Sequence, residues 1–283
     1  MESSRRDTSI FNFQFSILNA EFLIQLGVCG MPKREDYIGV FDSGIGGISV
    51  LKKLVKHLPG ERFLYFGDCA NAPYGTKSTE AVKALTLAAA QRLFDRGIKA
   101  LVVACNTATA AAIDTLREKY PQSIIVGIEP AVKLAYDHYP AGRVAVLATP
   151  VTLREEKFAQ LAEKFPQMEL LSIPLPGLVA QIEAGEDEKT LADFLRPTLA
   201  PYAGRLDAVV LGCTHYPLIA PVFREILGER IVLLDGAEGT ALQTKRRLEA
   251  AGLLSQDGGG IVFASSGDGD FESRCKAFLE DGQ

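Results

Sequence analysis

The sequence predicts an α/β protein built from two related halves, each a mostly parallel sheet flanked by helices. Short apolar strands alternate with helix-like segments along most of the chain, an order typical of parallel sheets. A strand-and-cysteine pattern also occurs twice, as K-A-L-V-V-A-C-N-T-A-T from Lys99 to Thr109 and as D-A-V-V-L-G-C-T-H-Y-P from Asp207 to Pro217. One such cysteine in each half indicates a site assembled from both.

The length and composition narrow the class of protein. At 283 residues the chain is long enough for one large domain or two of moderate size. A formal net charge of −5 gives no general attraction for nucleic acid or for an anionic membrane, so neither is expected as a partner. The 5 cysteines are odd in number and far apart, which disfavours a disulfide framework and favours a cytoplasmic location. No C-x2-C pair is present, so no metal site is expected.

Residues 1–35 are expected to form an N-terminal extension outside the folded core. Polar residues interrupt the apolar ones between Ser9 and Val28, which is not typical of a membrane span or of a secretory signal. Met31 follows at once, and we expect the folded part to begin near it. The alternative is an N-terminal helix or arm that packs on the core.

The first half alternates strand and helix from residue 38 onward. We expect strands at 38–41, 62–66, 100–104 and 124–126, and helices at 48–58, 78–96, 108–119 and 131–138. Ser78 is the expected N-cap of the second helix. Ligands of parallel sheets bind beyond the carboxyl ends of the strands, and Asp42, Tyr74 and Cys105 all fall in loops at that end.

A glycine-rich loop, D-S-G-I-G-G at 42–47, joins the first strand to the first helix. Backbone N–H groups at a helix N-terminus favour an anion, so a carboxylate ligand is a candidate here. The spacing is not G-x-G-x-x-G and no Lys-Ser follows, so a nucleotide site is not indicated.

The second half makes a similar pass. Strands are expected at 144–147, 169–173, 208–211 and 231–234, with a polar loop at 148–152 and helices at 153–164, 177–183, 188–202, 220–227 and from 235–239 to about 250. The strand at 144–147 corresponds to that at 38–41. A last strand is expected at 261–264 and a last helix at 270–279. They are additional to the elements of the second half, so we expect them to complete the first domain.

Each repeated cysteine has two interpretations. A free cysteine at the end of an apolar strand is often a small core residue. A thiol at a helix N-terminus instead has a lowered pKa, and the same N–H groups anchor a substrate carboxylate. Polar residues follow both cysteines, Asn106 and Thr107 after Cys105 and Thr214 and His215 after Cys213, which favours the reactive interpretation.

His215 and Asp42 are candidates to assist these thiols. Of the 3 histidines only His215 lies beside a candidate cysteine, whereas His57 and His138 fall in helical segments that we expect to be solvated. Asp42 is either the N-cap of the first helix or a contact of a ligand ammonium group or a thiol.

Four motifs, in this order, resemble those of the bacterial glutamate racemases: I-G-V-F-D-S-G-I-G-G at 38–47, P-Y-G at 73–75, A-C-N-T at 104–107 and G-C-T-H-Y-P at 212–217. The resemblance runs from about Asp36 to the C-terminus. It implies a cofactor-independent enzyme that interconverts L- and D-glutamate for peptidoglycan synthesis. It also implies two pseudo-symmetric domains, 36–130 with 239–283 and 131–238, an active site in the cleft between them, and a homodimer.

The resemblance also implies a role for each site residue. Cys105 matches the base for D-glutamate and Cys213 the base for L-glutamate, with Asp42 assisting the first thiol and His215 the second. The implied substrate-binding residues are Asp42, Ser43, Tyr74, Gly75, Asn106, Thr107, Thr149, Thr152, Glu183, Thr214 and His215.

Two thiols on opposite sides of a substrate suit racemisation without a cofactor. One face of Cα needs a base and the other an acid, and a carbanion-like transition state needs positive potential near the α-carboxylate. Three alternatives remain: an aspartate or other racemase, or a decarboxylase, of the same superfamily; a non-catalytic amino-acid-binding or regulatory protein; and a dithiol redox protein, which would need the two cysteine Cα atoms within about 7 Å.

Overall fold

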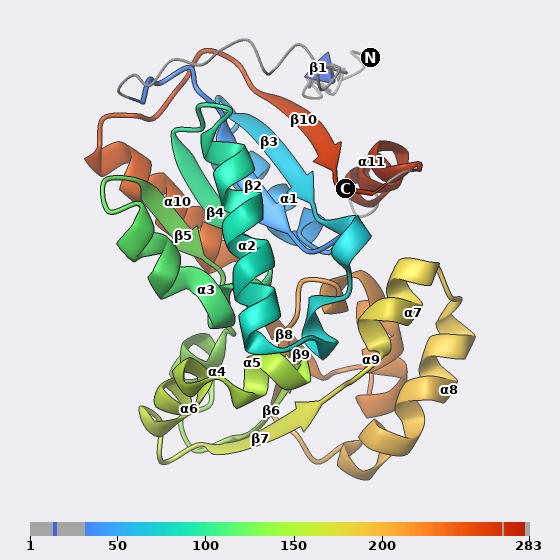
Figure 1. Ribbon diagram of the computed structural model, residues 1–283. Helices are drawn as coiled ribbons and strands as arrows, with labels where there is room; N and C mark the ends of the chain where they lie inside the picture. The colour runs from blue at the N-terminus through green and yellow to red at the C-terminus, as the bar shows by residue number, and fades with distance from the viewer. Residues whose placement is uncertain (1–13, 16–31, 268, 281–283) are drawn as a thin grey trace, which may run out of the picture.

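Two all-parallel β-sheets organise the computed structural model, which describes residues 14–15, 32–267 and 269–280 (Figure 1). The first sheet contains, in order across it, β1 (Gln14–Phe15), β10 (Gly260–Ser265), β3 (Arg62–Gly67), β2 (Ile38–Asp42), β4 (Ala100–Val103) and β5 (Ile124–Gly127). The second contains β7 (Glu169–Pro174), β6 (Arg143–Ala148), β8 (Ala208–Gly212) and β9 (Val232–Asp235). The predicted α/β class with parallel sheets is confirmed.

The same strand order occurs in both sheets. The strand orders are β3-β2-β4-β5 and β7-β6-β8-β9. In each unit, the strand that comes first in the chain pairs with the second strand on one side and with the third strand on the other, and the fourth strand lies beside the third. Cys105 follows β4 and Cys213 follows β8, so each cysteine lies just after the third strand of its unit. Both strands are apolar and buried along their length, as central strands of a parallel sheet are.

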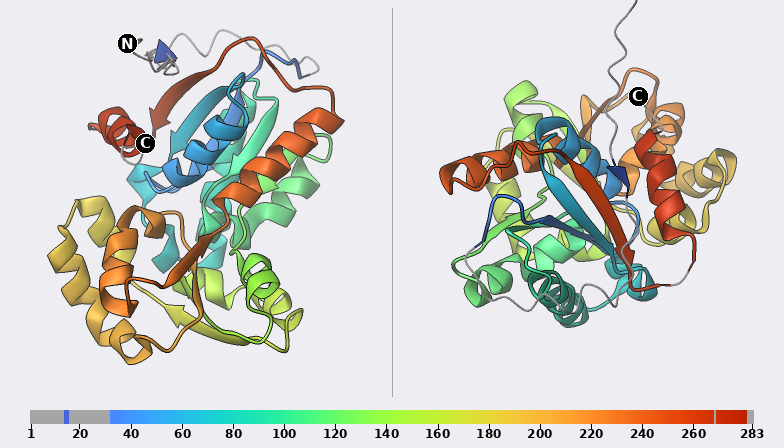
Figure 2. Two further views of the ribbon diagram at one scale, coloured as in Figure 1. Left: turned by 180° about the vertical axis from the view of Figure 1, so that it is seen from behind. Right: turned by 90° about the horizontal axis from the view of Figure 1, so that it is seen from above.

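Helices cover both faces of each sheet (Figure 2). Around the first sheet, α1 (Ile48–His57), α10 (Ala237–Ala250) and α11 (Phe271–Glu280) share one core, and α2 (Thr79–Phe94) and α3 (Asn106–Lys119) share another. Around the second, α7 (Leu178–Ala184), α8 (Glu188–Leu199) and α9 (Ala220–Leu227) pack on one face, and α4 (Val132–His138) and α6 (Glu156–Glu163) on the other.

Short helices occupy several of the loops that the sequence had left without structure. The 3-10 turns in such loops are Cys69–Asn71, Tyr74–Thr76 and Tyr216–Ile219, and a further one, Ala200–Tyr202, forms the end of the helix that was expected at 188–202. The predicted polar loop at 148–152 is wrong, because α5 (Pro150–Arg154) begins there. The Thr149 hydroxyl caps α5 by accepting the N–H of Thr152 at 3.3 Å. Pro150 occupies the first helical position, where proline is favoured. The single helix expected at 153–164 is broken at Glu155, which has an extended backbone.

Two cap predictions have opposite outcomes. Ser78 is the N-cap of α2, as predicted, since its hydroxyl accepts the N–H of Ala81 at 3.2 Å. Asp42 is not the N-cap of α1, because that helix begins only at Ile48, after the whole glycine loop. The Asp42 carboxylate is therefore available for other contacts.

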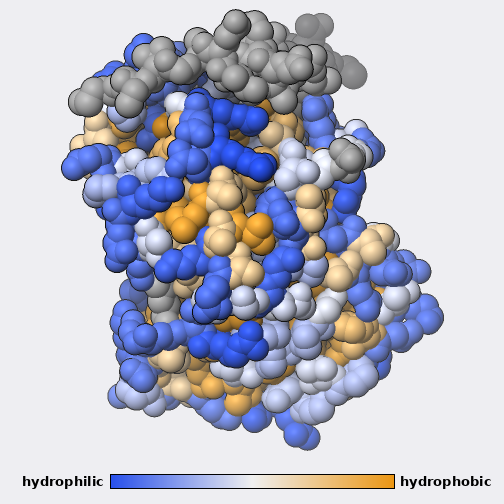
Figure 3. All heavy atoms as spheres, in the orientation of Figure 1, coloured by the Kyte–Doolittle hydropathy of each residue, from blue (hydrophilic) through white to orange (hydrophobic). Residues whose placement is uncertain are grey.

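The first and the last described strands both belong to the first sheet. β10 pairs with β3, so the last strand joins the first sheet, and β1 pairs with β10 at its outer edge. Most of the predicted extension, at 1–13 and 16–31, lies outside the described residues. The predicted limits of the extension and of the two domains stay predictions. No helix of the described part is long and apolar enough to cross a membrane. The face in Figure 3 is mostly hydrophilic, with hydrophobic residues in small groups.

Candidate active site

The Cys105 side of the site is formed where β4 ends and α3 begins. Cys105 is the residue before the first turn of α3, and its buried thiol lies 3.6 Å from the Ser43 hydroxyl, to which it donates. Burial raises the pKa of Cys105 to about 12, with the Asp42 charge adding to it, although the Ala108 N–H and the Ser43 hydroxyl act in the other direction. The expectation that the helix N-terminus lowers this pKa is wrong, because burial outweighs the helix.

The Cys213 side carries a histidine and a glutamate in series. The Cys213 sulfur lies 3.9 Å from Nδ1 of His215, and Nε2 of His215 lies 2.7 Å from Oε1 of Glu183. Burial lowers the pKa of His215, but the contacts with Cys213 and Glu183 and the charge of Asp42 outweigh it and raise that pKa well above its ordinary value. This direction favours the imidazolium form, in which one ring nitrogen donates toward Cys213 and the other toward Glu183.

Glu183 joins the two halves. It extends from α7, yet its Oε1 also accepts the N–H of Ile45 at 3.0 Å, and Arg274 of α11 contacts its other oxygen at 3.3 Å. Burial raises the pKa of Glu183, but the hydrogen bond and charge of His215, the Ile45 N–H and Arg274 together bring it below its ordinary value. Glu183 is a carboxylate that balances the charge of His215.

The glycine loop packs directly against this pair. A Cβ at Gly44 would lie 2.0 Å from Oε1 of Glu183, and one at Gly46 would lie 2.3 Å from Nδ1 of His215. The loop N–H groups do bind carboxylates, as expected, but these belong to the chain itself: Gly44 donates to Asp42 at 2.9 Å and Ile45 to Glu183. The loop therefore holds the catalytic candidates in place.

Asp42 links the end of β2 to the Cys213 turn. Its Oδ1 accepts the Thr214 hydroxyl at 3.1 Å, and the side chain is fully buried. Burial raises the pKa of Asp42, and the His215 charge together with the Gly44 and Thr214 hydrogen bonds opposes part of this rise. The negative charge of Asp42 acts on both Cys105 and His215.

Three threonine hydroxyls meet between the two halves. Thr107 of α3 lies 2.9 Å from Thr149 and 3.4 Å from Thr152, and the latter two are 3.0 Å apart. Gly75 approaches them so closely that a Cβ there would lie 2.6 Å from the Thr149 methyl carbon. The structure thus brings together three residues that the resemblance implies as substrate contacts.

Asn106 and Tyr74 complete the predicted set. Asn106 is 4% exposed, yet neither its side-chain oxygen nor its nitrogen has a hydrogen-bond partner, so this amide is a candidate to bind a ligand. The Tyr74 hydroxyl is already used, since it donates to Asp68 at 2.6 Å. Burial and then this bond raise the pKa of Tyr74, so its hydroxyl stays protonated.

Sequence reasoning missed Asp68 and Arg274. Asp68 comes directly after β3, as Asp42 ends β2, so the same signal would have found it. Nothing near Arg274 in the sequence marks it, because its contact with Glu183 spans 91 positions. The expectation that His57 is solvated is also wrong, since its side chain is only 21% exposed and contacts Glu238 of α10.

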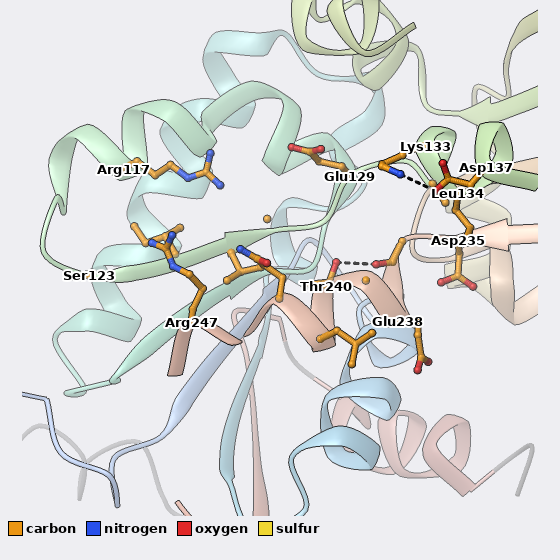
Figure 4. Close-up of a pocket in the computed structure, with 18 of the residues that line it drawn as sticks. Arg117, Ser123, Glu129, Lys133, Leu134, Asp137, Asp235, Glu238, Thr240 and Arg247 are labelled. Atoms are coloured by element: carbon orange, nitrogen blue, oxygen red, sulfur yellow. Dashed lines mark hydrogen bonds and ion pairs between the residues drawn. The ribbon is translucent and has the colours of Figure 1, made fainter. Parts of the chain in front are cut away.

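Two cavities lie outside the thiol pair. One of about 590 Å³ borders the site, because Asn106 and Thr152 line it. The other cavity, of about 830 Å³, is lined by Glu129 and Asp235, which lie near the two places where the chain passes from one sheet to the other (Figure 4). None of its lining residues belongs to the thiol site. Lys133 and Asp137 form an ion pair at its edge.

Two repeated parallel sheets, each with a buried thiol after its third strand, define a two-sided α/β enzyme of the racemase class. The family model for Asp/Glu/hydantoin racemases matches residues 38–244. The chain therefore belongs to the Asp/Glu/hydantoin racemase family. The resemblance drawn from the four motifs is confirmed.

Individual relatives narrow the comparison to glutamate racemases. The glutamate racemase of Clostridium perfringens ATCC 13124 is 46% identical over 222 residues, which cover 77% of this chain and 85% of that protein. The crystal structure of the RacE1 glutamate racemase of Bacillus anthracis has a TM-score of 0.79 at 30% identity, covering 87% of this chain and 94% of that one. That of the Francisella tularensis enzyme with D-glutamate has a TM-score of 0.76 at 31% identity, with the same coverages of 87% and 94%.

Proposed function

We propose that the protein interconverts L-glutamate and D-glutamate by a cofactor-independent two-base mechanism. The observation that carries this proposal is the placement of Cys105 and Cys213 after equivalent strands of the two sheets. Membership of the racemase family and the likeness to glutamate racemases support glutamate as the substrate. The product D-glutamate supplies peptidoglycan synthesis, a use that places the reaction in the cytoplasm.

In the direction from L to D, the Cys213 thiolate removes the α-proton and becomes a thiol. The Cys105 thiol gives its proton to the opposite face of Cα and becomes a thiolate. The raised pKa of Cys105 keeps this thiol protonated before substrate binds, which the role of acid requires. In the direction from D to L the roles exchange, and proton exchange with solvent resets the pair between turnovers.

The surrounding charges support this assignment. The His215 imidazolium places a positive charge 3.9 Å from the Cys213 sulfur, where the proton is taken up and returned. The Glu183 carboxylate, hydrogen-bonded to His215, and the negative charge of Asp42, from the first half, both raise the pKa of His215 and so favour its imidazolium form. Asp42 has no direct hydrogen bond to Cys105, so we propose that it acts on this thiol through its charge.

Substrate recognition is proposed for the polar groups around the thiols. The free amide of Asn106 and the N–H groups at the start of α3 would bind the α-carboxylate, where negative charge develops in the transition state. Ser43, Tyr74, Gly75 and Thr214 are further proposed contacts. The hydroxyls of Thr107, Thr149 and Thr152 bond to one another, and a substrate carboxylate would take over these donors.

The mechanism is tested in deuterated water. With L-glutamate as substrate, the first D-glutamate formed should carry deuterium at Cα, because its proton comes from the solvent-exchanged Cys105 thiol. The residual L-glutamate should stay unlabelled at early times. If deuterium entered the residual L-glutamate as fast as the D-glutamate product, a single base would be indicated. If the optical rotation of neither enantiomer changed with the enzyme, the proposed function would be wrong.

We also propose that the enzyme is a homodimer. Leu134 of α4 and Leu242 of α10 are each 42% exposed and line the same cavity, so they supply apolar surface for a second copy. Light scattering should give twice the chain mass, and L242E should give the monomer. A wild-type monomer at micromolar concentration would contradict this proposal.

A further inference from the structure

Arg274 reaches across from the first sheet's last helix to the second sheet's helix α7. Its Nη2 donates to the main-chain oxygen of Glu183 at 2.9 Å and to the carboxylate at 3.3 Å. Figure 1 shows α11 and α7 on the same side of the molecule. The main-chain oxygen belongs to the last turn of α7, where carbonyl groups lack helical partners and carry partial negative charge. Arg274 thus binds both the helix end and the side chain that leaves it.

Glu183 is fixed by donors from three directions. Ile45 holds Oε1 from the glycine loop, Arg274 holds Oε2 from α11, and His215 shares Oε1 at 2.7 Å. The first two donors come from around the first sheet, whereas Glu183 and His215 come from around the second. With both oxygens held, the carboxylate has one orientation, and so does the imidazolium next to Cys213.

We propose that Arg274 is a positioning residue for the racemase reaction, which acts on Cys213 through Glu183 and His215. Arg274 touches neither thiol in any of the contacts described, so it is not a catalytic residue. This inference rests on the proposed function. It assigns to the C-terminal helix α11 a part in catalysis, which the sequence had treated only as a completion of the first domain.

The charges around Glu183 give this role a pH signature. The groups that act on it or that it acts on are the cations His215 and Arg274, the acid Asp42, the phenol Tyr65, and the thiols Cys69 and Cys275. Burial raises the pKa of Glu183, and Arg274 is among the groups that lower it. Without Arg274 this pKa rises, so the carboxylate form is lost at a higher pH.

The test compares R274Q and R274K with the wild-type enzyme. We expect R274Q to lower kcat/KM by roughly 10- to 100-fold, because misplacing a catalytic group costs this much. The primary isotope effect should rise with 2-deuterio-L-glutamate, since the step at Cys213 becomes slower relative to the rest, and fall with 2-deuterio-D-glutamate. The acid limb of the pH profile should move to higher pH. R274K keeps the charge but not the planar guanidinium whose Nη2 donates to the main-chain and carboxylate oxygens of Glu183, so its kcat/KM, isotope effects and acid limb should lie between those of R274Q and the wild type.

R196Q is the matched control. Arg196 is 49% exposed and pairs with Glu225 at 2.6 Å on the protein surface, and Arg274 is similarly exposed, at 41%. R196Q should leave rate, isotope effects and pH profile unchanged. If R274Q loses activity with isotope effects and acid limb as in the wild type, Arg274 is only structural and the inference is wrong. Should R274Q not fold, R274K decides by the same readouts. An inactive wild type would instead refute the proposed function.

Discussion

Cys105 and Cys213 have different partners in the structure. Cys105 is buried and faces the negative charge of Asp42, and both raise its pKa and favour the thiol, whereas the Ser43 hydroxyl opposes part of this rise. Cys213 faces the imidazolium of His215, whose charge Glu183 maintains. We propose on this basis that Cys105 acts as the acid and Cys213 as the base in the direction from L to D.

Replacing either thiol by a hydroxyl should slow racemisation strongly. In C105S or C213S the serine hydroxyl is a far weaker acid than a thiol, so it is a poor partner for proton transfer near neutral pH. We expect kcat/KM to fall by roughly 10²- to 10⁴-fold in each variant. Circular dichroism of L- and D-glutamate solutions measures this loss. The control is C275S, since Cys275 is buried in the core away from the thiol pair; equal loss in C275S would argue against specific roles.

The His215 charge should give the enzyme an alkaline limit. Because the pKa of His215 is raised, its imidazolium persists below that pKa and is lost as the pH rises through it. E183Q removes the carboxylate that helps to raise this pKa, so the alkaline fall of kcat/KM should begin at lower pH than in the wild type. A pH profile of kcat/KM from pH 6 to 10 tests this. An unchanged alkaline limb in E183Q would mean that His215 does not need its charge.

At the scale of elements, the strand–loop–helix units were largely predictable because apolar strands and helix caps are local signals. Ser78 was found as a cap for this reason, and Cys105 was placed correctly between β4 and α3. Helix α5 was missed because its five residues are too few for a hydrophobic period. The contact of Arg274 with Glu183 joins positions far apart, and no local pattern encodes it.

The glycine loop gives a prediction at this scale. In G46A the new methyl group would lie 2.3 Å from the His215 ring, so the ring or the loop must shift. We expect kcat/KM to fall by roughly 10- to 100-fold while the protein still folds. The control is G239A, because a Cβ at Gly239 of α10 meets nothing within 4 Å. G239A should keep full activity, and a G46A enzyme as active as G239A would show that the loop does not position His215.

At the scale of the whole molecule, a buried ion pair lies at the end of β4 that is opposite to Cys105. Lys99, just before β4, lies 2.5 Å from the Glu61 carboxylate, and both side chains are almost fully buried. Lys99 also donates to the carbonyls of Arg34 and, at 3.0 Å, Leu253. It thereby joins the segment before β2, the central strand, and the loop that leads to β10. A lysine in the opening stretch of the repeat gave no hint of this, because lysine is rarely buried without a partner.

This arrangement separates stability from catalysis along one strand. E61Q would leave the Lys99 ammonium buried without its counter-charge, which costs roughly 3–5 kcal/mol of unfolding free energy. For a chain of this size, that lowers the melting midpoint by about 10 °C. Cys105 lies at the other end of β4, so kcat/KM per folded molecule should stay at the wild-type value. D193N removes the exposed pair of Lys189 and Asp193 and should hardly change melting. If E61Q has the same melting midpoint as D193N, the Lys99–Glu61 pair does not stabilise the first sheet. If E61Q stays folded but loses turnover, the two ends of β4 are coupled.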